Sequence, residues 1–300
     1  MIPVRARACL ELGFACTLWG FGFVAAVWAL RGGFGPNQVT AMRLTIGGGG
    51  SAIVIALIPG LRRSVSREQI WLAFLPGVWL SLTLVLQTWG LKYTTATKSG
   101  FVTTLYVLAV PVLERTLLKK RLPHGHLSAV AVACFGTALI CDFHGGGWNI
   151  GDLLTLGCAI AASFQIVWFG LLRDRTGDAF VFNALQALWA APLPLALAFA
   201  FEDWPKQAPT ALAWAGVASL TLGSTVIAFS LQVRAQKKLR PSTASLIFLM
   251  ESPFAAIFAM VLLGETLTRS QWFGALLILA TIIGSMARAA RSSAQGTSGV

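Results

Sequence analysis

Three ionisable side chains interrupt otherwise apolar stretches of this 300-residue chain, and their types suit the binding of a charged small molecule. Glu251 lies within one stretch, directly before Ser252-Pro253, Arg43 lies within another, and Lys98 stands at the start of a third. An ionised side chain in apolar surroundings is costly unless it faces a cavity or a partner. We therefore expect Glu251 to bind a substrate ammonium group or carry a proton. We expect Arg43 to bind a substrate carboxylate or to pair with Glu251.

Each of these side chains also has a structural explanation. Glu251 could be hydrogen-bonded to a neighbouring helix, Arg43 could extend to the outer interface, and Lys98 could anchor its helix there. Pro253 adds a feature beside Glu251, because its missing N–H leaves the carbonyl of Leu249 without a helical partner. Backbone exposed at this break could contact substrate or water.

Uncharged polar and aromatic side chains within the same stretches extend the candidate site. The polar residues are expected to bridge helices or to line a cavity. They are Gln87, Thr103, Thr104, Tyr106, Gln165, Asn183, Gln186, Thr225 and Ser245. Trp19 and Trp168 lie well inside their stretches, where an indole ring could stack on an apolar substrate group or pack against lipid. The predicted substrate-binding residues are Glu251, Arg43, Trp19, Lys98, Gln87, Tyr106, Gln165, Trp168 and Ser245.

Other site chemistries find no support in the sequence. The five Cys form no CxxC pair, the three His have no ligand partner at zinc spacing, and neither GxSxG nor HExxH occurs. An ATP-binding motif is absent as well. We expect no catalytic, cofactor-binding or metal site, and therefore no enzyme.

The composition of the chain is typical of a membrane protein rather than a soluble one. Hydrophobic residues make up 56% of the chain and charged residues 11%, whereas about a quarter of a soluble chain is charged. The net charge of +12 would suit nucleic acid if Lys and Arg formed a stripe on a compact domain, but they cluster at the ends of apolar segments. We therefore exclude a soluble domain and nucleic-acid binding, and expect the lipid bilayer as a partner.

Ten apolar segments are expected to position these side chains inside a membrane, although the shortest, 127–141, needs flanking residues such as His126 and Asp142 to reach both interfaces. A helix needs about 20 residues to cross about 30 Å of hydrocarbon. The segments are residues 10–30, 38–59, 70–91, 95–118, 127–141, 151–172, 179–201, 212–232, 243–264 and 270–290. The fold class predicted is all-α, a polytopic membrane protein with ten transmembrane helices joined by short loops.

Loop charges predict the orientation of these helices. Five of the 23 Lys and Arg fall on one side of the predicted bundle, Arg43 lies within a span, and the other 17 fall on the side of the N-terminus. The five are Arg31, Lys92, Lys98, Lys206 and Arg269. Positive residues concentrate in cytoplasmic loops. Both termini are therefore expected in the cytoplasm, in a multi-pass protein of the inner (plasma) membrane.

An internal repeat divides the chain. A proline-centred stretch at 100–113 resembles 242–255, and the alignment pairs Ala109 with Glu251. The prolines of both stretches are expected to kink their helices beside a central cavity.

The repeat predicts two halves of five helices each. They are residues 1–147 and residues 148–300, the second half ending in a short cytoplasmic tail. Because five is odd, the second half enters the membrane from the opposite side, so the halves are inverted repeats. Such repeats hold a substrate near the midplane between them in alternating-access carriers.

Four short motifs, spread over nearly the whole chain, resemble those of one transporter family. They are Trp19-Gly20 with Phe23, Arg43, the run ending in Pro253-Phe-Ala-Ala, and Leu262-Leu263-Gly264-Glu265-Thr266-Leu267. The family is the drug/metabolite transporter superfamily, EamA type. The resemblance implies a ten-helix, two-repeat bundle that exports small metabolites or amino acids, similar to the YddG-like group of bacterial amino-acid exporters. In many relatives a Gly-Glu pair ends the fourth span, whereas this chain has Lys119-Lys120 there.

The function predicted is that of a secondary transporter. It would export small metabolites, above all amino acids including aromatic and hydrophobic ones, by alternating access driven by a gradient of substrate alone or of protons. Two alternatives stay open, an exporter of drugs or other small organic molecules by proton exchange, and a uniporter or channel-like facilitator. Saturable flux would favour a carrier over a pore.

Overall fold

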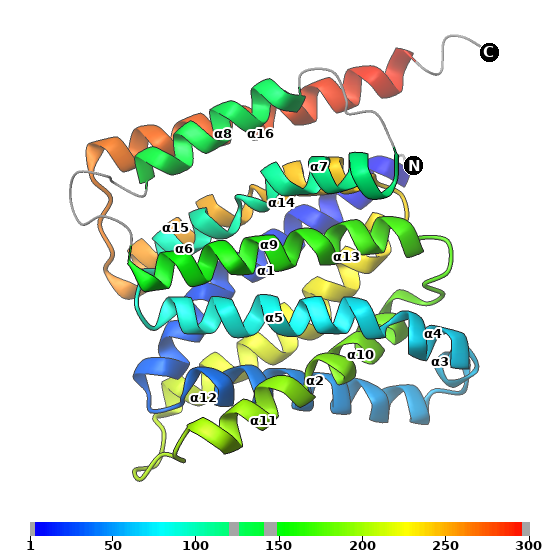
Figure 1. Cartoon of the computed structure of the whole chain (residues 1–300), viewed down its shortest axis with the longest axis vertical. Helices are drawn as coiled ribbons and strands as arrows, with labels where there is room; N and C mark the ends of the chain where they lie inside the picture. The colour runs from blue at the N-terminus through cyan, green and yellow to red at the C-terminus, as the bar shows by residue number, and fades with distance from the viewer. Residues whose placement is uncertain (1–3, 120–125, 141–148, 296–300) are drawn as a thin grey trace.

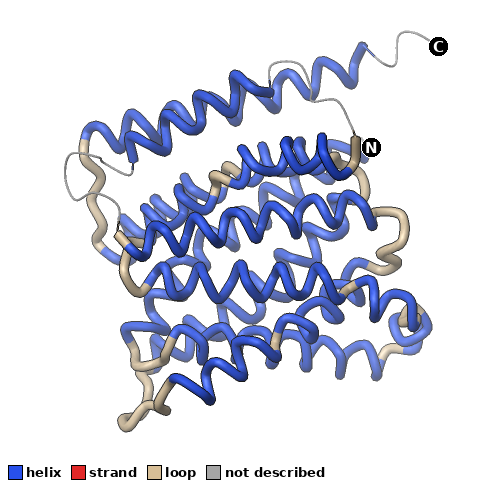
Figure 2. The backbone as a smooth tube through the Cα atoms, in the orientation of Figure 1, coloured by secondary structure: helices blue, strands red, loops and turns tan. Residues whose placement is uncertain are grey.

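The fold consists of helices joined by short loops (Figures 1 and 2). The computed structural model describes residues 4–119, 126–140 and 149–295, and these ranges contain no strand. The all-α prediction is therefore confirmed. The predicted boundary between residues 147 and 148, and Cys141 at the end of the predicted fifth span, lie outside the described residues.

Eight stretches of the described chain are long and apolar enough to cross a membrane. The elements in chain order are α1 (Val4–Arg31), α2 (Pro36–Leu57), α3 (Pro59–Arg63), α4 (Arg67–Leu72), α5 (Phe74–Leu91), α6 (Ala96–Thr103), α7 (Tyr106–Leu117), α8 (His126–Ile140), α9 (Ile150–Leu172), α10 (Ala179–Ala190), α11 (Pro192–Phe201), α12 (Ala211–Ser219), the π-helix η1 (Leu220–Ala228), α13 (Phe229–Gln236), α14 (Pro241–Phe248), α15 (Glu251–Leu263) and α16 (Arg269–Gln295). The eight stretches are α1, α2, α4 with α5, α6 with α7, α9, α10 with α11, α12 to α13, and α14 with α15. The predicted fifth and tenth spans fall on α8 and α16, and the count of ten stays a prediction.

Two of these stretches contain a tightened turn near their middles, and a third breaks at Ala191, between α10 and α11. Between α6 and α7 the N–H of Leu105 donates to Val102, and between α14 and α15 the N–H of Met250 donates to Ile247. Such bonds to the third preceding residue tighten the chain locally and end one helix before the next begins. Tyr106 and Glu251 are the first residues after the two interruptions.

The helices pack as a layered bundle in which segments distant in sequence are neighbours. Helix α1 contacts α12, η1 and α15, whereas α9 contacts α5 and α7. Helix α2 packs on α10, and α8 packs along α16 at one edge of the bundle (Figure 1). Gly20 permits the contact of α1 with α15, because a Cβ at this position would lie 2.6 Å from the Cβ of Phe254.

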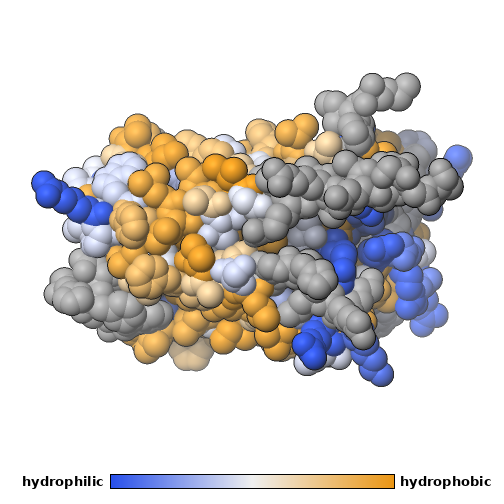
Figure 3. Space-filling view, turned by 90° about the horizontal axis from the view of Figure 1, so that it is seen from above, coloured by the Kyte–Doolittle hydropathy of each residue, from blue (hydrophilic) through white to orange (hydrophobic). Residues whose placement is uncertain are grey.

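The surface is apolar around the middle of the bundle and polar toward one end. Large apolar side chains such as Leu57, Phe199 and Val261 are exposed on the outside of the bundle. In Figure 3 the most hydrophilic side chains gather mainly at the right, the end at which α1 begins, here called the N side. This pattern is typical of a lipid-facing surface with charged residues at its interfaces.

Ion pairs fasten the N side of the bundle. The carboxylates of Glu11, Glu68 and Glu114 pair with Arg234, Arg175 and Arg240, at nitrogen–oxygen distances of 3.0, 2.5 and 3.0 Å. In all three pairs the acid precedes residue 120 and the base follows residue 149.

Carboxylates of the later part of the chain fasten the opposite side. Asp152 pairs with Lys98 at 2.7 Å. Glu202 accepts hydrogen bonds from two N–H groups at the start of α2, and Glu265 from two at the start of α6. Each of these acids follows residue 149, and each contacts a residue that precedes residue 120, so the pattern of the N side is reversed.

Candidate functional site

A cavity lies within the helix bundle, and the empty space between its lining side chains, including the part open to solvent, is about 560 Å³. It is lined by Trp19, Gly22, Arg43, Thr83, Leu84, Gln87, Thr103, Tyr106, Ala162, Gln165, Ile166, Leu220, Ser224, Phe229, Gln232, Phe248 and Glu251. These residues come from helices throughout the chain, from α1 to α15. The mixture of apolar walls with a few polar groups is typical of small-molecule sites.

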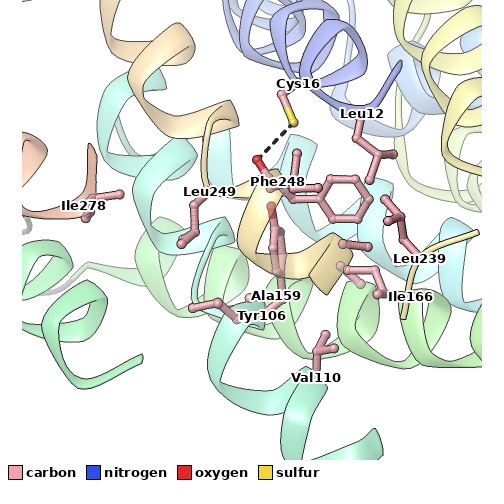
Figure 4. Close-up of a cluster of buried hydrophobic side chains, with 14 of the residues drawn as sticks. Leu12, Cys16, Tyr106, Val110, Ala159, Ile166, Leu239, Phe248, Leu249 and Ile278 are labelled. Atoms are coloured by element: carbon pink, nitrogen blue, oxygen red, sulfur yellow. Dashed lines mark hydrogen bonds between the residues drawn. The ribbon is translucent and has the colours of Figure 1, made fainter. Parts of the chain in front are cut away.

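Aromatic rings form a continuous wall of this cavity. The ring of Phe248 lies 6.2 Å from that of Tyr106 and 5.3 Å from that of Trp19, between ring centroids. Trp19 in turn lies 5.1 Å from Phe229. Figure 4 shows Phe248 in the buried cluster with Tyr106, and Cys16 donating to the carbonyl of Ile247 beside it. The wall suits an apolar or aromatic substrate group.

Glu251 is the one carboxylate among the residues that line the cavity. It is 6% exposed, and the hydroxyl of Tyr106 donates to its Oε2 at 3.3 Å. Within the described ranges no Lys or Arg forms an ion pair with it. Tyr106 and Glu251 occupy similar positions, since each begins a helix after an interruption, and the pairing of Glu251 with Ala109 in the sequence alignment stays a prediction.

The backbone break beside Glu251 is satisfied by a local hydrogen bond. The hydroxyl of Ser252 donates to the carbonyl of Leu249 at 3.0 Å. The expectation that this carbonyl is exposed for substrate or water is therefore wrong, because the chain supplies its own donor.

Arg43 is 3% exposed and lines the same cavity, so it does not extend to an interface. Its Nε donates to Oγ1 of Thr225 at 2.9 Å. No carboxylate of the described chain lies within ion-pair distance of its guanidinium, so the predicted alternative of a pair with Glu251 does not occur. One cavity therefore presents a guanidinium and a carboxylate that do not neutralise each other.

Three further predicted residues line the cavity. Trp19 donates from its Nε1 to the carbonyl of Ser224 at 3.4 Å. Gln165 donates to Oε1 of Gln186 at 3.3 Å, and Gln87 also faces the cavity. Together with Glu251, Arg43 and Tyr106, the structure thus brings six of the nine predicted site residues to one place.

The other three predicted residues lie elsewhere, each for a physical reason. Lys98 pairs with the fully buried carboxylate of Asp152. Asp152 lies in the first turn of α9, where its carboxylate also accepts a hydrogen bond from the N–H of Asn149. Trp168 packs in a separate apolar cluster with Phe169. Ser245 is buried and donates back to the carbonyl of Ser242 within its own helix.

Sequence reasoning missed several lining residues, among them Phe229, Gln232 and Phe248. Phe248 is three residues before Glu251, so the helical repeat could have placed the two on one face. Gln232 was the last residue of a predicted span, but helix α13 continues to Gln236. Oε1 of Gln232 is buried without a partner among the described residues, which leaves it available to a ligand. Phe229 carried no distinguishing signal within its apolar run.

The described part of the chain holds no cluster of three or more His, Cys, Asp or Glu that could bind a metal ion. The prediction that the protein uses no metal or cofactor stays a prediction.

Comparisons with known proteins bear on this arrangement. Residues 8–141 and residues 149–287 each match the EamA-like transporter family. An uncharacterized transporter of Archaeoglobus fulgidus is 32% identical over 282 residues, covering 93% of this chain and 85% of that protein. The uncharacterized transporter YetK of Bacillus subtilis is 27% identical over 206 residues, covering 66% of this chain and 61% of that protein. A solved crystal structure with 21% identity superposes with a TM-score of 0.75 over 96% of this chain and 99% of its own, which shows that the fold is shared.

Proposed function

We propose that this protein exports amino acids, including aromatic and hydrophobic ones. The premise is that the chain belongs to the EamA-like transporter family and is a multi-pass membrane transporter of small molecules. Export would proceed by alternating access across the inner membrane. The proposal makes both termini cytoplasmic, with the N side facing the cytoplasm.

One observation carries this proposal. Arg43 and Glu251 line one cavity without pairing with each other, and an aromatic wall completes the cavity. A zwitterionic amino acid offers a carboxylate to the guanidinium, an ammonium group to the carboxylate, and an apolar side chain to the rings. A substrate with both charges satisfies both buried groups, whereas an uncharged drug leaves both unsatisfied.

Two inverted five-helix halves, residues 1–147 and 148–300, are part of the proposal. The two separate family matches support the division. The helix contacts support it as well. If α1 of the first half is equivalent to α9 of the second, and α5 to α12, then the contact of α1 with α12 has its equivalent in the contact of α9 with α5, and both contacts are present. Inverted halves supply two equivalent arrangements, each open to one side.

Flux measurements test the substrate. Purified protein in proteoliposomes should move labelled phenylalanine and leucine with saturable kinetics, and unlabelled substrate on the far side should accelerate exchange. Arg43→Gln and Glu251→Gln should each raise KM about tenfold or more, the loss expected when one charged hydrogen bond disappears. Glu68→Gln, which removes an exposed ion pair with Arg175, serves as the control. Absence of both flux and binding for every amino acid would refute the proposal.

The energy source is tested separately. A pH jump applied to wild-type and Glu251→Gln proteoliposomes distinguishes proton exchange from facilitated export. Proton movement that depends on Glu251 supports exchange, and equal proton movement in both excludes Glu251 as the coupling residue. Flux that does not saturate with concentration would favour a channel-like facilitator.

The orientation is tested by thiol labelling in a cysteine-free background. Arg63→Cys lies on the N side and Gln207→Cys on the opposite side, both at exposed positions. In intact cells an impermeant reagent should label only Gln207→Cys. Labelling of Arg63→Cys instead would reverse the assignment.

A further inference from the structure

The guanidinium of Arg43 is held by one edge only. Its Nε donates to Thr225, and the two terminal nitrogens have no acceptor in the ranges that the structure describes. A guanidinium offers five N–H groups in a planar fork. Four of them therefore stay free for a ligand in the cavity that Arg43 lines.

Thr225 is itself fixed by a chain of buried polar groups. Its carbonyl accepts a hydrogen bond from Nδ2 of Asn183 at 2.9 Å, and Gln186 donates to Oδ1 of Asn183 at 2.8 Å. Gln165 donates to Gln186, and Gln165 itself lines the cavity, so the series of hydrogen bonds ends at the cavity wall. All of these residues are buried, and a connected polar network in apolar surroundings is rigid when its members are satisfied.

The backbone at Thr225 is unusual as well. Thr225 lies in η1, a nine-residue π-helical stretch, and such turns are rare and frequent at functional sites. Carbonyls of this stretch accept from side chains of other helices, from Trp19 at Ser224 and from Asn183 at Thr225 and Val226. The stretch is thus tied to two other walls of the bundle.

Close packing brings Arg43 to this anchor. Gly47 is one helical turn after Arg43 in α2, and a Cβ at Gly47 would lie 3.2 Å from Cγ2 of Thr225. A larger residue would push α2 away from η1 and lengthen the bond between Arg43 and Thr225. The glycine, the threonine and the arginine therefore form one geometric unit.

We infer that Thr225 is a positioning residue that selects how the cavity binds a carboxylate. Because Thr225 occupies Nε, the edge formed by the two terminal nitrogens is the one that receives the two oxygens of a substrate carboxylate. This inference rests on the proposed function, which supplies the carboxylate. It adds that recognition depends on a planar two-oxygen anion held end-on by Arg43.

Three related probes separate carboxylate recognition from general damage. They are phenylalanine, 2-phenylethylamine, which lacks the carboxylate, and 3-phenylpropionate, which lacks the ammonium group. Each is measured as flux in proteoliposomes and as a thermal shift of purified protein, in wild type, Thr225→Val and Thr225→Ser. Thr88→Val is the matched control, because Thr88 is also buried and accepts a hydrogen bond across helices, but its donor is Thr40, which does not line the cavity, rather than Arg43, which does.

Thr225→Val should weaken the binding of phenylalanine and 3-phenylpropionate about tenfold, the worth of one hydrogen bond to a charged group, through KM rather than the maximal rate. The amine should change less than about twofold, Thr225→Ser should restore carboxylate binding, and Thr88→Val should match wild type. Equal losses for all three probes, or a Thr225→Ser variant as weak as Thr225→Val, would overturn the inference.

The two proposals fail in different ways. Wild-type protein that is stabilised by 3-phenylpropionate but moves no probe refutes transport of these compounds, and the comparison of variants by thermal shift still decides the role of Thr225. Wild-type protein that neither binds nor moves any carboxylate refutes both.

Discussion

Removal of the Glu202 carboxylate should loosen the start of α2, the helix that carries Arg43. The two oxygens of Glu202 accept from the N–H groups of Asn37 and Gln38 at 2.8 and 2.9 Å. These N–H groups belong to the first turn of α2, where no helical acceptor exists. The carboxylate also complements the partial positive charge at the start of the helix.

The expected cost follows from these contacts. Each hydrogen bond is worth about 1 kcal/mol at a partly exposed helix end, and the helix dipole adds about 0.3 to 1 kcal/mol. Glu202→Ala should therefore lower the free energy of unfolding by about 2 to 3 kcal/mol. Glu202→Gln should cost about 1 to 2 kcal/mol, because its amide oxygen still accepts one bond but the second bond and the charge are lost.

Denaturation of the detergent-solubilised protein in rising SDS, followed by tryptophan fluorescence, measures these differences. Asp203→Ala is the matched control. It removes an adjacent exposed carboxylate that makes no side-chain hydrogen bond in the described chain, so it should lie within about 0.5 kcal/mol of wild type. Equal effects of Glu202→Ala and Asp203→Ala would refute the reasoning, since the loss would then reflect net charge alone.

Three further predictions follow from the site. Lys98→Met should lower the free energy of unfolding by about 3 kcal/mol, because it leaves the buried Asp152 carboxylate without its cation. The same variant should not change KM for substrate in flux assays. Phe248→Ala should raise KM for phenylalanine more than for alanine, since it removes part of the aromatic wall; equal changes would show that the ring has no direct contact. Gly47→Leu should reduce the preference for phenylalanine over 2-phenylethylamine in the same direction as Thr225→Val, whereas Gly50→Leu, where a Cβ would contact nothing within 4 Å, should not.

The spans were predictable because their length is set by physics that the sequence records directly. A run of about 20 apolar residues is needed to cross a bilayer, and the predicted run at 179–201 coincides with Ala179–Phe201 in the structure. The interruptions were less accessible. The interruptions end at Leu105 and Met250, before Pro111, which lies inside α7, and Pro253, which lies in the first turn of α15. The kinks expected at these two prolines stay a prediction.

The site was predictable where an isolated charge had to face a cavity, as for Arg43 and Glu251. It was not predictable for Lys98, because the position of its partner Asp152 depends on how α6 meets α9. Nor does a sequence distinguish Phe229 or Phe248 from other aromatic residues of an apolar run. The π-helical stretch at η1 had no local signal either, since its geometry depends on side chains contributed by α1, α2 and α10.

The carboxylates at the two ends of the bundle have a consequence for engineering. Glu11, Glu68 and Glu114 clamp one end, Asp152, Glu202 and Glu265 clamp the other, and no residue serves both. Substitution of these carboxylates can therefore weaken the contacts at one end of the bundle without changing those at the other end or the residues that line the cavity. A pair of such variants, one weakened at each end, would provide two differently biased forms of the same molecule for trapping and for inhibitor selection.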